Sequence, residues 1–146
     1  MAAGPNEPGS GRPPLLAGMP GWLPAAAVGL GPVLAAVVGK ILGNYYGPGF
    51  AVVCVIAAGL AAAAAASNWL WYLIPALPPV IWLVGAVAEL EWRNPPYEGT
   101  KAEAVGLVHA TTHTFPVIAV CAVVMGSVAV WGTVQERKKK GARRGR

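Results

Sequence analysis

The longest apolar stretch of the chain runs from Phe50 to Leu90, and its first charged residue is Glu89. A bilayer core about 30 Å thick takes roughly 20 helical residues to cross, so this stretch is long enough for two crossings and a tight turn. The polar pair Ser67-Asn68 marks the turn, and rings that favour the headgroup region follow it at Trp69, Trp71 and Tyr72. The pattern therefore predicts a hydrophobic hairpin with spans at about 50–67 and 70–91.

Apolar segments on either side of this hairpin predict two further spans. Residues 22–43 are apolar except for Lys40, whose amine can reach the interface along its own stem. A last apolar run covers residues 115–133. We therefore expect an all-α polytopic membrane protein with four transmembrane helices, which form one domain over residues 22–134. A three-span arrangement with the first segment peripheral is the alternative.

Prolines and small residues predict local features of these spans. Pro75, Pro78 and Pro79 lie in the first part of the third span, so this helix is expected to begin late or to bend there. The Ala-rich end of the second span favours tight packing against neighbouring helices. Gly39 and Gly43 form a GxxxG step that allows two helices to approach closely.

The two ends of the chain differ in composition. Residues 1–21 are rich in proline and glycine and predict a disordered N-terminal tail. Residues 135–146 form a basic tail that we expect to contact anionic lipids of the bilayer and not nucleic acid, because it adjoins an apolar span. The alternative for this tail is a simple topology signal. It holds seven of the eleven basic residues of the chain: Arg137, Lys138, Lys139, Lys140, Arg143, Arg144 and Arg146.

The distribution of charge predicts an orientation. Four spans place both termini on one side, which carries Arg12 and the seven tail charges, while the other side carries Lys40, Arg93 and Lys101. The positive-inside tendency then makes both termini cytoplasmic, in a multi-pass protein of the cell (plasma) membrane. Aromatic residues agree with an inner belt of Trp22, Trp69, Trp71, Tyr72 and Trp131, and an outer belt of Tyr45, Tyr46, Trp92 and Tyr97.

Chemistry-bearing residues are few, since only 12% of the chain is charged. Cys54 and Cys121 lie in apolar runs and are expected to be buried, inert thiols. Glu89 and Glu91 close the third span; at i and i+2 they point to different faces, so we expect solvated end charges. The sharper alternative is an ion pathway that uses Lys40 with Glu89.

Two histidines are the only candidate metal ligands that the sequence offers. Residues 100–115 look helical but are too polar for the middle of a membrane. His109 and His113, at i and i+4, share a face at a spacing that can bind zinc, but the sequence supplies no convincing third and fourth ligands. No metal and no cofactor is therefore predicted. We expect an interfacial helix whose neutral imidazoles hydrogen-bond to threonines such as Thr112.

Three features together resemble a known family. They are the stretch LIPALPPVIWLVGAVAE (residues 73–89), the run HTFPVIAVCAVVMGSVAVW (residues 113–131) and the basic tail. Over about residues 22–137 the chain resembles a family of small actinobacterial (high-GC Gram-positive) four-span membrane proteins catalogued as a domain of unknown function. The family pattern would place basic residues in the turn at residues 67–69, where this chain has none. The resemblance implies an integral membrane protein of unknown activity, with some relatives that look connected with cell division or envelope assembly.

These observations lead to an expected function without catalysis. We expect a structural or interaction (scaffold) component of the cell envelope or division machinery, which binds the lipid bilayer and a membrane protein partner or a second copy of itself. A small transporter or exporter subunit is the alternative, although spans one, two and four hold no Asp or Glu. An enzyme is not expected, because the chain contains no GxSxG or HExxH constellation.

Overall fold

The structure is a computed structural model that describes residues 15–16 and 18–145, and it contains four helices. They are α1 (Leu23–Ile41), α2 (Pro48–Ala64), α3 (Ser67–Trp92) and α4 (Thr100–Arg144), and no strand occurs in this part of the chain. The all-α fold class is confirmed. Most of the predicted disordered tail (residues 1–14 and 17), together with Arg146 of the basic tail, lies outside the described residues.

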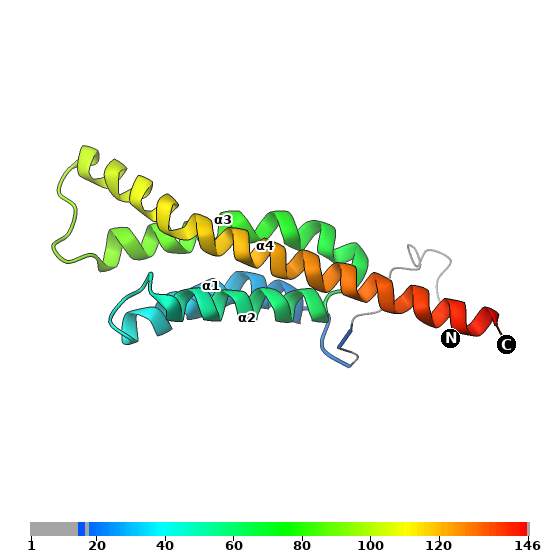
Figure 1. The fold of residues 1–146 in the computed structure, drawn as a ribbon. Helices are drawn as coiled ribbons and strands as arrows, with labels where there is room; N and C mark the ends of the chain where they lie inside the picture. Colours follow the sequence, from blue (N-terminus) through cyan, green and yellow to red (C-terminus); the bar gives the residue numbers. More distant parts are fainter. Residues whose placement is uncertain (1–14, 17, 146) are drawn as a thin grey trace.

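The helices lie side by side and alternate in direction (Figure 1). The α1–α2 and α3–α4 connections lie at one end of the bundle, which we call the loop end. The start of α1, the α2–α3 turn and the end of α4 lie at the opposite end. Helix α2 packs mainly against α1 and α4, and α3 packs mainly against α4 and α1.

Three of the helices, α1, α3 and α4, are long and apolar enough to cross a membrane. Helix α2 has 17 residues, which at 1.5 Å per residue gives a length of about 26 Å. It ends at Ala64, three residues earlier than the predicted span, because Ala65 and Ala66 adopt extended backbone and form the turn into α3.

The outer surface of the bundle is apolar on every helix. Exposed large side chains include Leu30 and Leu34 on α1, Val52 and Ile56 on α2, and Val123 on α4. Soluble monomers rarely expose so much contiguous apolar surface. This surface is compatible with a protein surrounded by lipid.

Helix α3 begins at Ser67 and continues through its prolines, so the expectation of a late start is wrong. Pro75, Pro78 and Pro79 lie inside the helix, and α3 is bent along its length (Figure 1). Each proline removes one backbone hydrogen bond and crowds the preceding turn, which is the usual cause of such a bend. The expectation of a bend agrees with the structure.

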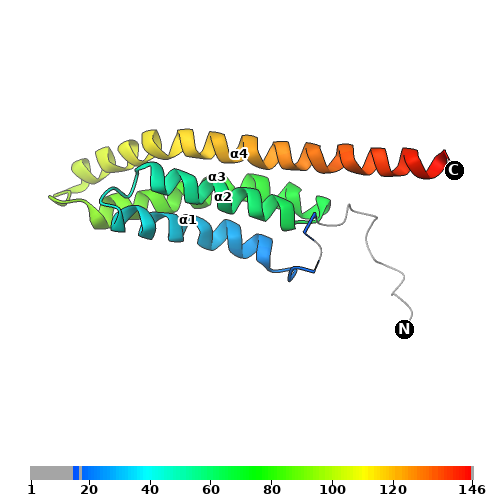
Figure 2. The same cartoon turned by 60° about the horizontal axis from the view of Figure 1, so that its bottom comes forward.

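Helix α4 is one uninterrupted helix of 45 residues. The sequence predicted three pieces here: a polar helix to residue 115, a span at 115–133 and a basic tail from 135. The structure joins them, because backbone hydrogen bonding continues whatever the polarity of the side chains. At 1.5 Å per residue α4 is about 68 Å long, more than twice the thickness of a bilayer core. Its C-terminal part projects beyond the rest of the bundle (Figures 1 and 2).

Small residues bring the helices together, as the Ala-rich segment predicted. Ala58, Ala61 and Ala62 of α2 are fully buried, and a Cβ at Gly31 of α1 would lie 2.5 Å from the Cβ of Ala57. The GxxxG step at residues 39 and 43 does not join two helices. Gly39 packs on the backbone of the α1–α2 turn. Gly43, at φ +85°, lies in that turn after the end of α1. Both cysteines are free and buried, as expected: Cys54 and Cys121.

Candidate functional site

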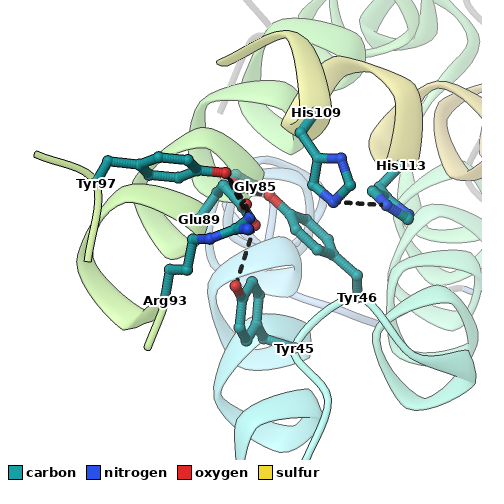
Figure 3. Close-up of polar contacts among 8 residues, drawn as sticks. All are labelled: Tyr45, Tyr46, Gly85, Glu89, Arg93, Tyr97, His109 and His113. Atoms are coloured by element: carbon teal, nitrogen blue, oxygen red, sulfur yellow. Dashed lines mark hydrogen bonds and ion pairs between the residues drawn. The ribbon is translucent and has the colours of Figure 1, made fainter. Parts of the chain in front are cut away.

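A buried carboxylate is the main polar feature of the loop end (Figure 3). Glu89 is 1% exposed, so the expectation of a solvated end charge is wrong for this residue. Its Oε1 accepts hydrogen bonds from Arg93 Nη1 (2.7 Å) and from the hydroxyl of Tyr97 (2.7 Å). Its Oε2 accepts a third from the hydroxyl of Tyr45 (3.0 Å). We call Glu89, Arg93, Tyr45 and Tyr97 the carboxylate cluster.

Three separate segments build the carboxylate cluster. Glu89 lies in the last turn of α3, and Arg93 follows it four residues later, at the spacing that lets two helical side chains meet. Tyr45 belongs to the α1–α2 connection and Tyr97 to the α3–α4 connection. Gly106 of α4 provides the room for the second tyrosine, because a Cβ there would lie 2.6 Å from Tyr97 Cε2. The cluster therefore joins the two connections of the loop end.

Tyr46 forms a second contact beside this cluster. Its hydroxyl donates to the carbonyl of Gly85 on α3 (2.5 Å), and its ring stacks on His113 of α4 at 5.1 Å between centroids and 10° between planes. The absence of a side chain at Gly85 allows close approach of Thr114, since a Cβ there would collide with the threonine methyl group. The α1–α2 connection is thus held against both α3 and α4.

The predicted outer aromatic belt is used for packing inside the protein. Trp92 is half-buried; its ring makes an edge contact with Tyr45 at 6.3 Å, and Lys40 Nζ lies 4.4 Å from its ring centre. The structure does not bring Lys40 and Glu89 together as the ion-pathway alternative requires. The Lys40 amine lies over the ring of Trp92, and the Glu89 carboxylate pairs with Arg93. By contrast, the predicted inner belt, represented by Trp22 and Trp71, is exposed.

The surroundings of the cluster determine the protonation states of its tyrosines, of the neighbouring Tyr46 and of Arg93. Burial, followed by the hydrogen bond to Glu89, raises the pKa of Tyr45 to about 12. Burial also raises the pKa of Tyr46 and, together with Glu89, that of Tyr97. The hydrogen bond to Glu89 raises the pKa of Arg93. At neutral pH the tyrosines are therefore protonated donors and the guanidinium is charged, as the three hydrogen bonds to the carboxylate require.

His109 and His113 pair with each other and not with threonines. Their Nε2 atoms are 3.0 Å apart, and both side chains are exposed on α4 (Figure 3). The expected bond to Thr112 is wrong, because this hydroxyl donates to the carbonyl of Val108 one turn back. Thr111 and Thr114 bond in the same way, which satisfies their hydroxyls within the helix. Across the described residues, no group of three or more His, Cys, Asp or Glu side chains could hold a metal ion.

The basic residues of the C-terminal tail are exposed along the last turns of α4, from Arg137 to Arg144. Arg143 and Arg144 lie in the final turn, where positive charge interacts favourably with the helix dipole. With the exception of Arg146, which is not described, the predicted membrane-surface residues therefore share one helical extension. They are Arg137, Lys138, Lys139, Lys140, Arg143 and Arg144.

Sequence reasoning missed the partners of Glu89. The four-residue spacing to Arg93 was a usable signal for the ion pair. No local pattern could identify Tyr45, which is 44 residues away from the carboxylate.

These features define an all-helical protein with three helices able to cross a membrane, a buried carboxylate cluster at one end and a basic helical extension at the other. Comparisons with protein-family models, curated proteins and solved structures find no match to this chain. The resemblance to the actinobacterial four-span family stays a prediction.

Proposed function

We propose that this chain is a multi-pass protein of the cell membrane that crosses it four times, has both termini in the cytoplasm and acts as a scaffold in the cell envelope or division machinery. In this proposal it works through contacts with lipid and with a membrane protein partner, or a second copy, and not through catalysis. The single observation that carries the proposal is the shape and charge of α4, which continues from the apolar bundle into an exposed basic helix.

A fourth crossing by α2 has two lines of support. Its 17 residues lie at the lower limit of natural spans, about 17 to 25 residues. Its outward stripe, Val52, Ile56 and Leu60, is exposed and apolar, while the opposite stripe, which includes Phe50 and Cys54, is buried against the other helices. A helix with this pattern suits a position between lipid and protein.

The basic extension supports a role at the cytoplasmic surface. Residues Arg137 to Arg144 continue α4 beyond the bundle, so their charges are carried on a helix and lie next to the membrane end of the span. Each basic residue near an anionic leaflet contributes about 1 kcal/mol of attraction. A helical extension also presents a defined face to a protein partner at the same surface.

The buried carboxylate favours a scaffold over a transporter. A transported ion or proton must reach its site from each side of the membrane in turn. Glu89 is 1% exposed and holds three hydrogen bonds from three neighbouring side chains, which suits a structural joint between the two loop-end connections.

The test is the position of the protein in living cells. A fluorescent protein fused after Arg146 is expressed at native level in the source organism, next to a matched fusion in which the six described tail cations are replaced by glutamine. The proposal predicts fluorescence concentrated at division sites or growing tips, and reduced concentration in the glutamine variant. Uniform membrane fluorescence of both fusions would refute the scaffold role and favour the transporter. A transporter would further require that a growth or flux phenotype of the protein disappears in the Glu89→Gln variant.

A further inference from the structure

We propose that His109 and His113 form a two-histidine chelate site for a divalent transition-metal ion, with the remaining coordination positions filled by water. The two side chains lie one turn apart on the exposed face of α4, and their Nε2 atoms are separated by 3.0 Å. This site goes beyond the proposed scaffold role and does not depend on it.

The separation of the two nitrogens matches ligands of one ion. With metal–nitrogen bonds of about 2.0–2.1 Å, two nitrogens 3.0 Å apart subtend an angle of about 94° at the metal. This is close to the right angle between neighbouring ligands in square-planar and octahedral geometry. It is a few tenths of an ångström short of the separation of about 3.3 Å that tetrahedral zinc requires. The site is therefore best suited to Cu²⁺ or Ni²⁺, which favour tetragonal nitrogen and oxygen ligands.

The surroundings hold one of the two rings in place. His113 stacks on Tyr46, whose hydroxyl is fixed by the carbonyl of Gly85. The ring of His109 meets that of His113 at 69° with centroids 4.3 Å apart. On metal binding, the ring that donates in the Nε2···Nε2 hydrogen bond takes its other neutral tautomer, with the proton on Nδ1, so that both Nε2 atoms carry a lone pair. Because the His113 ring is already held, metal binding costs less side-chain conformational entropy than it would for two free side chains. This strengthens a chelate with only two protein ligands.

The nearby charges do not oppose a cation. The neighbouring charged cluster holds Glu89 and Arg93, which form an ion pair with no net charge. The site lies at the loop end, among the polar residues that open α4, where water can complete the coordination shell.

The test uses the full-length protein in detergent micelles, purified with a tag that contains no histidine. His109 and His113 are the only histidines of the chain, so no other imidazole competes. Ni²⁺ and Cu²⁺ are titrated by calorimetry, and the nitrogen couplings of bound Cu²⁺ are counted by electron paramagnetic resonance. The variants are His109→Ala and His113→Ala, and Thr112→Ala is the matched control.

The proposal predicts one ion per chain, two coupled nitrogens, and binding at least about tenfold weaker in either histidine variant, with Thr112→Ala unchanged; tenfold corresponds to about 1.4 kcal/mol. The nitrogen count in the unmodified protein is independent of whether the variants fold. Binding that survives both histidine substitutions, sulfur coordination from Cys54 or Cys121, or four coupled nitrogens from two chains would overturn it, as would the absence of binding.

Discussion

The carboxylate cluster predicts a specific loss of stability when Glu89 is changed. Glu89→Ala removes the acceptor for three hydrogen bonds, from Arg93, Tyr97 and Tyr45. Hydrogen bonds between side chains in a membrane protein average about 0.6 kcal/mol each, so the alanine variant should lose about 2 kcal/mol of unfolding free energy. Glu89→Gln keeps one acceptor oxygen but loses the charge. Because charge-assisted bonds are about twice as strong as neutral ones, we expect it to lose about 1 kcal/mol.

The measurement is unfolding in mixed micelles, followed by far-ultraviolet circular dichroism. Glu91→Gln is the matched control, since Glu91 is exposed on the same helix two residues away, and its substitution should change the free energy by less than about 0.5 kcal/mol. The order of stability should be Glu91→Gln, then Glu89→Gln, then Glu89→Ala. Equal stability of the two glutamine variants would refute the structural role of the cluster.

Three further predictions concern other parts of the molecule. Gly31→Ala places a methyl group 2.5 Å from the Cβ of Ala57 and should cost about 1–3 kcal/mol of unfolding free energy, whereas Gly126→Ala, where a Cβ has no neighbour within 4 Å, should be neutral in the same assay. The pKa of Tyr45 is raised from 10.0 to about 12, so its contribution to stability is present below pH 10 and is lost as pH rises through 12; the unfolding free energy should fall across this window, and less steeply in Tyr45→Phe. Glutamine at Lys138, Lys139 and Lys140 should weaken sedimentation with anionic vesicles of a soluble carrier protein fused to residues 135–146, by about 1 kcal/mol per residue; unchanged sedimentation would contradict lipid binding by the tail.

The apolar pattern predicted the positions of α1, α2 and α3 to within a few residues, because crossing a bilayer imposes a length on each apolar segment. It could not predict that one helix runs from Thr100 to Arg144. The polarity of that region changes twice, while the backbone hydrogen bonds that define a helix do not depend on side-chain polarity. Pro116 lies inside this helix, which tolerates it because a proline there removes a single backbone hydrogen bond.

The candidate site was less accessible to sequence reasoning. The spacing of Glu89 and Glu91 correctly separated them onto different faces, and the structure buries the first and exposes the second. Which face is buried depends on tyrosines from distant connections, and such long-range pairing leaves no local pattern. For the histidine pair the spacing did predict a shared face of one helix. The preference of the imidazoles for each other depends on side-chain conformations that the sequence does not specify.

In the proposed topology all four helices cross the membrane, and α2 is the helix whose crossing most needs a test. Single cysteines are placed at Asn44, Asn68, Glu98 and Gly145 in a background with Cys54 and Cys121 replaced by alanine, and each is labelled in intact cells with a membrane-impermeant maleimide. The account predicts labelling from outside at positions 44 and 98, and protection of positions 68 and 145 until the cells are opened. Equal accessibility of positions 44 and 68 would show that α2 does not cross, and labelling of position 145 from outside would place the basic helix on the wrong side of the membrane.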